Sequence, residues 1–398
     1  MKTVLHEYAH HFLISSSRSA MPRWLSEGSA EYFSSARFNP DGSVDIGLPN
    51  NARAYEISQA APVSLRELLD YDLYKQNRGN RYDAFYGRAW LLYHYLRFNP
   101  DRQGQLVNYW QKVATGMDSL EAGEMVFGDL DVLERELRSY GRERNMKGMR
   151  WPGSEIQIGA ISTAALSEGH AAMMDIQMQS KRGVSREQAL EMLPSARSIA
   201  QRYPEDAAAL AALAEVEYDA GNDAAAIAAA DRAIAIDPNI KNAYVQSGYA
   251  QFRQAAKVEG RAERKEAYQA AMRPFEALNA LEPDHTQPLI YYYRSFALSG
   301  GTIPEDAKFA LERATQLAPF DQRLAIQVAI MHARDGNTDI TELLLAPVAA
   351  DPHGGRQADI AKLMLAALED AEPNSPFDLI AVRRAYNAAR AAERNESE

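Results

Sequence analysis

The sequence predicts a mostly α-helical protein made of two parts joined by a linker. In residues 1–142, apolar residues recur at helical spacing between short segments rich in glycine, proline and asparagine. From residue 166 onward, alanine-rich segments are interrupted by prolines at regular intervals, a pattern typical of stacked helix pairs. At 398 residues the chain also exceeds a single ordinary core, so two domains are expected.

Composition and charge exclude several classes of protein. The chain has no cysteine, which rules out disulfides, thiol catalysis and cysteine-ligated zinc. The net charge is −11; residues 1–150 carry 19 basic and 19 acidic side chains, whereas residues 151–398 carry 24 and 35. Because phosphate binding needs a positive field, we expect no nucleic-acid partner. No apolar run is long enough to form a transmembrane segment.

The first part is expected to contain a series of helices with one irregular insert. Apolar spacing and breakers place the helices near residues 2–15, 23–36, 64–70, 82–97, 102–115, 118–126 and 130–142. The insert, residues 39–61, is rich in turn residues. Within it, the alternation of Val44, Ile46 and Leu48 predicts a short strand.

The most specific chemical signal is the HExxH segment His6-Glu7-Tyr8-Ala9-His10. On a helix, residues four apart point the same way, so His6 and His10 can present two imidazoles to one metal ion. Neutral imidazoles with one further carboxylate suit Zn²⁺, with a fourth position left to water. Glu7 lies beside the same face and is expected to take a proton from that water as general base.

The third ligand is expected on the second helix. Pro22 cannot continue the first helix and leads into the helix predicted at residues 23–36, where Glu27 and Glu31 lie one turn apart on one face. We assign Glu27 as the third metal ligand. Glu31 is expected to accept a hydrogen bond from the free ring nitrogen of His6, because metal-bound histidines usually have such a partner.

These two segments together resemble gluzincin zinc metallopeptidases of the peptidase-MA-like type. The pattern in that family is HExxH followed by W-L-x-E-G-x-A-x-Y, which residues 6–10 and 24–32 match. The resemblance implies that Glu27, the glutamate of the E-G pair, is the third ligand. A carboxylate that braces the first histidine in thermolysin-like relatives maps to Glu31. The resemblance further implies zinc as cofactor and a peptide or protein as substrate.

The resemblance also suggests an oxyanion-stabilising tyrosine. Aminopeptidases of this group carry a tyrosine in a Y-x-K-G-x-x-L-L helix, and the nearest counterpart here begins at Tyr86, within YGRAWLL. Arg88 stands where lysine is usual, Ala89 stands where glycine is usual, and the leucine pair comes one residue early. A phenol can donate to a developing oxyanion. The alternative is that Tyr86 belongs to the core, since tyrosines crowd this segment.

The position of the HExxH segment is unusual. Peptidases of this type usually have a β-sheet ahead of the HExxH helix, whereas here residues 1–5 run straight into it. We therefore expect either a protein start upstream of Met1 or a reduced domain that lacks this sheet. The sequence does not decide the compartment for the same reason. We expect an exported protein if a signal peptide precedes Met1, and a cytoplasmic protein otherwise.

The second part is expected to be an array of helix pairs. Residues 143–165 are assigned to a linker because Gly148, Pro152 and Gly153 are breakers, and residues 155–159 are expected to add a short strand to the first part. Beyond the linker, intervals of 34, 45, 36 and 33 residues separate the prolines Pro204, Pro238, Pro283, Pro319 and Pro352. The long interval holds a charged insertion around residues 257–265, expected as a lengthened helix or loop.

This spacing resembles the tetratricopeptide (TPR) family over about residues 170–352. Residues 204–238 fit best, although Ala230 replaces the usual aromatic and Tyr218 is one residue out of register. The domain is expected to span residues 166–398, with capping helices within 359–391, after a peptidase-like domain at 1–142. The concave surface of such an array binds proteins or peptides. The alternative to repeats is a non-repetitive, alanine-rich helical domain, and the alternative to binding is a scaffold that only supports the peptidase-like domain.

Two functions follow from the sequence. The first is a zinc peptidase in which His6, His10 and Glu27 hold zinc, Glu7 and Tyr86 act in catalysis, and the repeats recruit a protein substrate or partner. The second is a TPR interaction scaffold whose truncated peptidase-like domain binds zinc without turnover. The substrate, the exo- or endopeptidase choice and the oligomeric state do not follow from the sequence.

Overall fold

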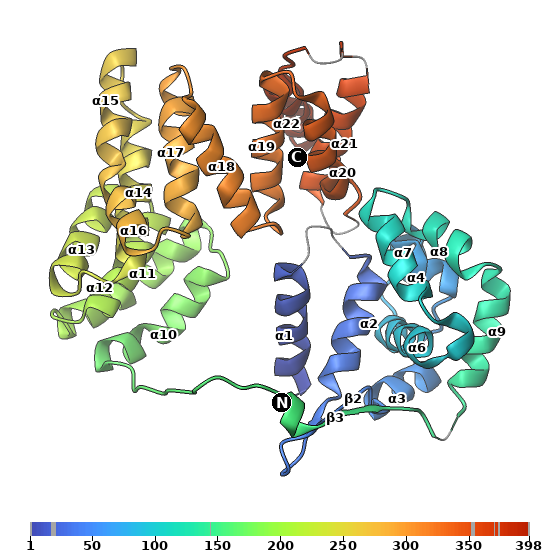
Figure 1. The fold of residues 1–398 in the computed structure, drawn as a ribbon. Coiled ribbons are helices and arrows are strands. Elements are labelled where there is room, and N and C mark those ends of the chain that lie inside the picture. Colours follow the sequence, from blue (N-terminus) through green and yellow to red (C-terminus); the bar gives the residue numbers. More distant parts are fainter. Residues whose placement is uncertain are drawn as a thin grey trace. The chain divides into compact units, whose positions relative to one another are not determined.

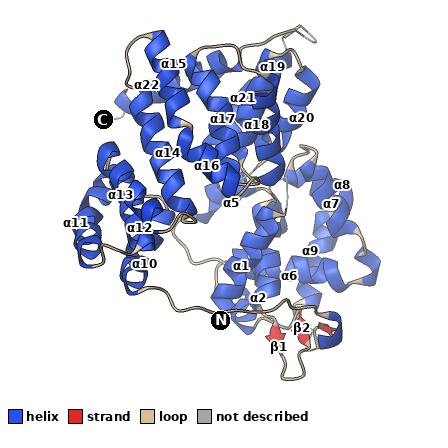
Figure 2. Cartoon of the chain, turned by 60° about the vertical axis from the view of Figure 1, so that its left-hand side comes forward, coloured by secondary structure: helices blue, strands red, loops and turns tan. Residues whose placement is uncertain are grey.

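The predicted fold class is confirmed: the protein is mostly α-helical, with a small sheet (Figures 1 and 2). The computed structural model describes residues 2–16, 21–143, 145–351, 355–369, 371–372 and 375–396. The chain divides into two compact units, Met1–Gly159 with Pro319–Glu398, and Ala160–Ala318. The domain boundaries expected from the sequence stay a prediction.

The first part contains the expected helices and two further ones. The observed helices are α1 (Lys2–Ser15), α2 (Arg23–Ser34), α3 (Asn51–Gln59), α4 (Leu65–Leu69), α5 (Tyr71–Arg78), α6 (Phe85–Phe98), α7 (Gln105–Ala114), α8 (Ser119–Phe127) and α9 (Leu130–Tyr140). Helix α3 falls in the insert that the sequence predicted as irregular. Helix α5 was not predicted, although Asp70 caps it by accepting from the backbone of Asp72 and Leu73.

The small sheet consists of β1 (Arg37–Phe38), β2 (Val44–Ile46) and β3 (Met149–Trp151), all antiparallel in this order. The strand expected from the Val44–Leu48 alternation is therefore confirmed. The prediction of a strand at residues 155–159 is wrong, because the third strand lies earlier in the linker. Buried Asp45 explains the register: its carboxylate pairs with Arg150 of β3 at 2.6 Å and with Arg37 of β1 at 2.9 Å.

Helix α2 is fixed in the core by packing against α6 and by a buried tryptophan. Trp24 is 0% exposed, and its indole nitrogen donates to the Tyr109 hydroxyl at 2.9 Å. Leu25 and Tyr32 are buried in the same cluster. The helix that carries Glu27 is thus held from several sides, whereas in α1 only Ala9 is buried.

Gly28 allows the close approach of α2 and α6. A Cβ at this position would lie 2.5 Å from the carbonyl oxygen of Ala89 and 3.2 Å from the Cβ of Tyr93. Backbone cannot move aside as a flexible side chain can. The E-G pair of the sequence pattern therefore combines a carboxylate with a residue that lets its helix pack tightly.

We expect Gly28→Ala to lower the free energy of unfolding by about 1–3 kcal/mol, the usual range for overpacking. The gain in helix propensity of about 1 kcal/mol opposes this loss but does not exceed it. Urea unfolding followed by tryptophan fluorescence tests it, since all four tryptophans lie within residues 1–151. Gly159→Ala, where a Cβ meets nothing within 4 Å, is the matched control. An unchanged midpoint for Gly28→Ala would contradict the tight contact.

The second part consists of consecutive helix pairs. Its helices are α10 (Glu168–Lys181), α11 (Arg186–Arg202), α12 (Ala207–Asp219), α13 (Asp223–Ile236), α14 (Lys241–Ala255), α15 (Arg261–Ala271), α16 (Arg273–Leu281), α17 (Thr286–Ser299) and α18 (Glu305–Leu317). Beyond Pro319 follow α19 (Gln322–Arg334), α20 (Thr338–Ala349), α21 (Arg356–Glu369) and α22 (Leu379–Glu396). The TPR-like helix pairs expected from the sequence are confirmed.

The recurring prolines mark the ends of the second helix of each pair. Pro204, Pro238, Pro283 and Pro319 each follow such a helix directly, where the next turn begins. Pro352 lies outside the described residues. The 45-residue interval contains a turn and two short helices, α15 and α16, because Pro274 interrupts the second helix of that pair.

Buried alanines hold the best-fitting pair together. Ala214 of α12 and Ala226, Ala230 and Ala233 of α13 are all fully buried. Small side chains allow the two backbones to approach closely, which explains why alanine replaces the usual aromatic at residue 230.

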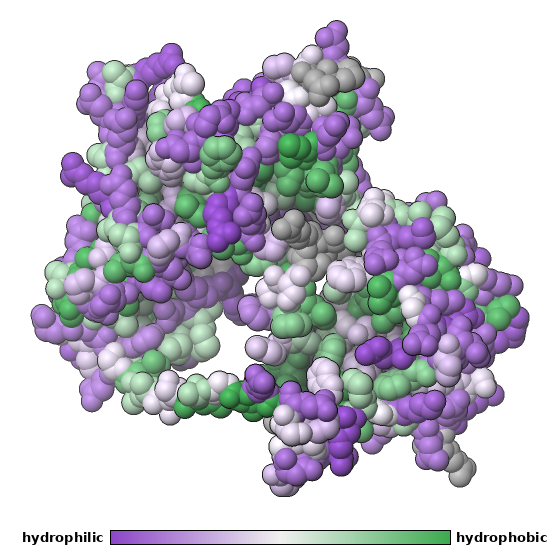
Figure 3. Space-filling model, viewed as in Figure 1, coloured by the Kyte–Doolittle hydropathy of each residue, from purple (hydrophilic) through white to green (hydrophobic). Residues whose placement is uncertain are grey.

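The segment between β3 and α10 begins with a short 3-10 helix, Gly153–Glu155, and then exposes apolar side chains. Figure 3 shows hydrophobic residues at the surface along it, where Ile158 and Ile161 are exposed. None of the described helices combines the length and the apolar content needed to cross a membrane.

Candidate metal centre

Helices α1 and α2 bring the three predicted ligands together. The Nε2 atoms of His6 and His10 lie 3.1 Å apart. The Oε2 atom of Glu27 lies 3.5 Å from His6 Nε2 and 3.3 Å from His10 Nε2. Three atoms from two helices therefore converge on one point, and they form the one group of metal-type donors found among the described residues.

The donor set fits a zinc ion by geometry and by chemistry. Zinc–ligand bonds of 2.0–2.1 Å in a tetrahedron place neighbouring ligand atoms about 3.3 Å apart, close to the three distances in this cluster. In addition, Glu27 Oε2 is buried and receives no well-oriented hydrogen bond from any described residue. A buried carboxylate oxygen whose nearest donors are poorly oriented is costly, and a cation at this point would satisfy it.

The charges of the cluster depend on one another. Hydrogen bonds to Glu27 and Glu31 raise the pKa of His6 from 6.5 to about 9. Burial alone would raise the pKa of Glu27, but the imidazoles of His10 and His6 outweigh it and lower that pKa from 4.5 to about 2. Without metal, a proton on His6 thus takes the place of the cation.

We expect the apparent zinc affinity to rise by about tenfold per pH unit between pH 7 and 9, because zinc must displace the His6 proton. In the metal-free protein, the raised pKa of His6 stabilises the fold below pH 6.5, and this contribution is lost as the pH rises through about 9. The lowered pKa of Glu27 contributes above pH 4.5 and is lost as the pH falls through about 2. Competition titrations with a zinc chelator at several pH values measure the slope. A slope near zero would show that no such proton is displaced.

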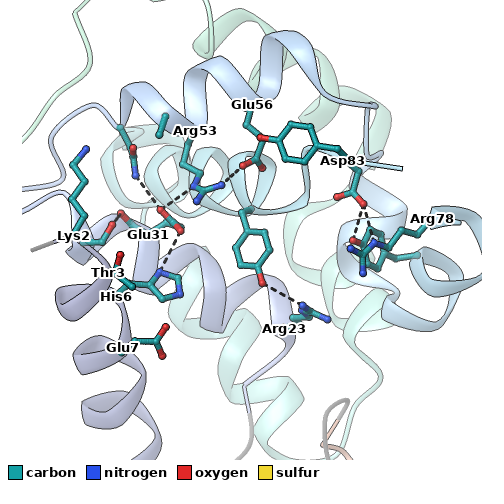
Figure 4. A pocket seen from close by; sticks show the side chains of 16 residues that line it. Lys2, Thr3, His6, Glu7, Arg23, Glu31, Arg53, Glu56, Arg78 and Asp83 are labelled. Carbon is teal, nitrogen blue, oxygen red and sulfur yellow. Dashed lines mark hydrogen bonds and ion pairs between the residues drawn. The ribbon is translucent and has the colours of Figure 1, made fainter. Parts of the chain in front are cut away.

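A second ring of side chains orients the histidines. Glu31 Oε1 lies 3.2 Å from His6 Nδ1, and Ser26 Oγ lies 3.1 Å from His10 Nδ1. The other oxygen of Glu31 accepts from Asn50 at 3.0 Å and pairs with Arg53 at 3.0 Å. Figure 4 shows Glu31 between His6 and Arg53. Burial alone would raise the pKa of Glu31, but His6 and Arg53 outweigh it and hold that pKa below its usual value.

We expect Glu31→Ala to weaken zinc binding by about 10–100-fold, the usual effect of removing a partner of a metal-bound histidine. The loss frees the His6 ring and leaves Arg53 facing the site with one carboxylate fewer. Isothermal titration with zinc measures the change. Glu121→Ala, which removes an exposed carboxylate of α8, is the control. Equal affinities of the wild type and Glu31→Ala would show that Glu31 does not brace His6.

A cavity of about 600 Å³ opens beside the cluster, lined by side chains of α1, α2, α3, α5 and α6. Glu7 is exposed on α1 and lines this cavity together with His6 (Figure 4). Tyr86, at the start of α6, lines it as well, and its hydroxyl accepts a hydrogen bond from Arg23 Nη2 at 3.4 Å. The structure thus brings every predicted site residue to the cluster or to the cavity beside it; their chemical roles stay predictions.

Several polar residues of the site were missed by the sequence analysis. Arg23 precedes Glu27 by four residues, so helical spacing from the ligand could have indicated it, whereas Ser26, directly before Glu27, carried no such signal. Asn50 and Arg53 carried no such signal, since they belong to α3 within the segment that was predicted as irregular. Asn50 stands at the N-cap of α3, yet its side chain donates to Glu31 instead of capping the helix.

One family model matches the first part of the chain. Residues 1–118 match the family model described as "Protein of unknown function (DUF1570)". The match spans 118 of 398 residues and contains the whole candidate metal centre. No curated protein matches the sequence.

Three solved structures are similar to part of the chain. One is a thermophilic TPR protein of Thermus thermophilus, with 16% identity and a TM-score of 0.41, covering 49% of this chain and 97% of that one. Two are MamA proteins: the MamA RS-1 ArsTM double mutant, and MamA from residue 41 to its end from Desulfovibrio magneticus RS-1. They have 17% and 16% identity and TM-scores of 0.36 and 0.34, and cover 49% and 52% of this chain and 99% and 100% of theirs.

Proposed function

We propose that the protein is a zinc-dependent peptidase. The observation that carries this proposal is the convergence of His6, His10 and Glu27 at zinc-like spacing, with Glu7 beside them on the wall of an open cavity. The choice of a peptide bond as substrate rests on the resemblance of residues 6–10 and 24–32 to gluzincin peptidases.

Each residue of the site has a defined task in this proposal. Zinc held by His6, His10 and Glu27 would lower the pKa of a bound water and polarise the substrate carbonyl. Glu7 accepts the proton of the attacking water and delivers it to the leaving amine. Tyr86 donates a hydrogen bond to the oxygen on which negative charge develops. Glu31 and Ser26 fix the ring orientations of the two histidines.

Metal analysis and cleavage assays on the full chain test the proposal. Elemental analysis is expected to give one zinc per chain, and a mixture of unrelated peptides is expected to be cleaved. A chelator should stop the cleavage and added zinc should restore it. A chain that takes up no zinc refutes the proposal, and so does a zinc-loaded chain that cleaves none of the peptides.

A second candidate is an interaction scaffold, and a row of aromatic side chains on the helix pairs favours it. Tyr218, Tyr249 and Tyr291 on α12, α14 and α17 follow one another with ring centroids 5.6 and 5.2 Å apart. Gln246, one turn before Tyr249, is only 4% exposed, and its Oε1 has no hydrogen-bond partner among the described residues. The three rings are half-buried, and their exposed parts suit stacking by an extended peptide.

Comparing zinc uptake, peptide cleavage and partner binding in the wild type and in Tyr249→Ala distinguishes the peptidase from the scaffold. The scaffold is supported if the chain takes up zinc but cleaves no peptide. It also requires a partner protein that binds the wild type but does not bind a Tyr249→Ala variant of equal stability. Zinc-dependent cleavage that is unchanged in Tyr249→Ala supports a peptidase that does not need this row for small peptides.

A further inference from the structure

Arg23 occupies a special position in the candidate site. It is the first residue of α2, one turn before Glu27, and it lines the cavity with Glu7 and Tyr86. Its side chain is 22% exposed, so most of the guanidinium group has left water. Removing a cation from water is costly unless an opposite charge or several hydrogen bonds compensate for it.

The other arginines of the cavity have carboxylate partners, whereas Arg23 has only a distant one. Arg53 pairs with both Glu31 and Glu56, and Arg78 pairs with Asp83 at 3.2 Å. For Arg23, the nearest carboxylate oxygen recorded among the described residues is Glu27 Oε1, at 3.9 Å. Its hydrogen bonds go to neutral phenols, the hydroxyls of Tyr71 and Tyr86. The cavity therefore holds a positive charge that an anionic group could still approach.

Aromatic rings hold this guanidinium in place. Its central carbon lies 4.8 Å from the ring centroid of Tyr71 and 5.4 Å from that of Phe85, both within cation–π range. The group is thus fixed before any substrate arrives, as electrostatic preorganisation requires.

The hydrogen bond to Tyr86 has a directional consequence. A phenol has one proton to donate and lone pairs that accept. Because Arg23 has no acceptor to offer, the Tyr86 oxygen must accept from it, and the Tyr86 proton is left for another group. No described residue accepts that proton.

We propose that Arg23 is a positioning residue that holds the Tyr86 hydroxyl with its proton toward the cavity, ready to donate to a tetrahedral oxyanion. This inference rests on the proposed peptidase function. Arg23 lies outside the HExxH and W-L-x-E-G positions that match the peptidase pattern. The ligand of this part of the site would be an anionic tetrahedral group derived from a peptide carbonyl.

A double-mutant cycle on the zinc-loaded full chain tests the coupling. The probe is a phosphinic dipeptide, a stable tetrahedral anion, and its dissociation constant is measured by calorimetry. We expect Arg23→Gln and Tyr86→Phe each to weaken binding by about 100-fold, the loss typical of one oxyanion donor. If Arg23 acts through Tyr86, the double variant should be no more than about threefold weaker than either single variant.

Controls separate this role from a structural one. Zinc content and the unfolding midpoint should match the wild type in both single variants. Arg66→Gln, an exposed arginine of α4 paired with Glu124, should leave probe binding unchanged. Millimolar guanidinium should partly restore binding to an Arg23→Ala variant, but not to one that also carries Tyr86→Phe.

Three results would overturn the proposal: unchanged probe binding in Arg23→Gln, effects of the two substitutions that multiply, or a wild type that binds no probe. Cleavage assays distinguish this failure from failure of the proposed function. If the wild type cleaves peptides while the two effects multiply, only the role of Arg23 is refuted. If the coupling holds but no peptide is cleaved, only the peptidase function is refuted.

Discussion

Replacing Glu7 by glutamine is expected to lower zinc-dependent peptide cleavage by about 10²- to 10⁴-fold, because an amide cannot accept the proton of the attacking water. Glu7 is exposed and lines the cavity, so the substitution removes no buried contact. It also lies outside the group of three donors, and the zinc content should therefore stay at one per chain. Initial rates at saturating peptide, with zinc measured on the same samples, give the result.

Glu121→Gln is the matched control for Glu7→Gln, since Glu121 is also an exposed carboxylate on a helix and does not line the cavity. Its activity should equal that of the wild type. If Glu7→Gln retains more than about a tenth of the activity, another group must act as the base. If it loses zinc as well as activity, Glu7 contributes to metal binding and the assignment of roles is wrong.

Trp24→Ala is expected to lower the free energy of unfolding of the first part by about 3–5 kcal/mol, the range for removing a buried aromatic side chain. Trp24 is fully buried, and its truncation leaves a large cavity and removes one of the two hydrogen bonds of the Tyr109 hydroxyl, which keeps the one with Ser119 at 2.8 Å. Since Glu27 lies one turn further along the same helix, zinc affinity should fall as well. Urea unfolding followed by the fluorescence of the remaining three tryptophans measures the loss.

Trp24→Phe separates packing from hydrogen bonding. Phenylalanine keeps most of the ring contacts but cannot donate to Tyr109, so we expect a loss of about 1–2 kcal/mol. Equal losses for Trp24→Phe and Trp24→Ala would mean that the hydrogen bond, and not the buried ring, holds α2 in place.

Local spacing made the centre of the site predictable. His6 and His10, like Glu27 and Glu31, are four residues apart on a helix, and helical geometry alone fixes which way such pairs point. The recurring prolines worked in the same way for the repeats, because proline usually ends a helix, although Pro194 and Pro347 lie inside α11 and α20.

Features that depend on tertiary contacts were not predictable from spacing. Asn50 and Arg53 reach Glu31 only because α3 forms within a segment rich in turn residues, where packing against α6 outweighs local propensity. The third strand was placed too late in the linker because its position depends on Arg150 meeting Asp45, residues 105 positions apart. Spacing places Arg23 one turn before Glu27, but its hydrogen bonds to Tyr71 and Tyr86 join residues 48 and 63 positions apart and are visible only in three dimensions.

Helix α1 supplies two of the three donors but buries only Ala9, and its apolar residues Val4, Tyr8 and Phe12 are exposed. Its main neighbour is α2, which supplies the third donor. A metal ion at this point would therefore cross-link the two helices, and the local stability of α1 would depend on the concentration of free zinc. Amide hydrogen exchange in α1 would then follow metal availability, while exchange around Trp24 would not. The free zinc concentration around the protein would then decide how firmly α1 is held against α2.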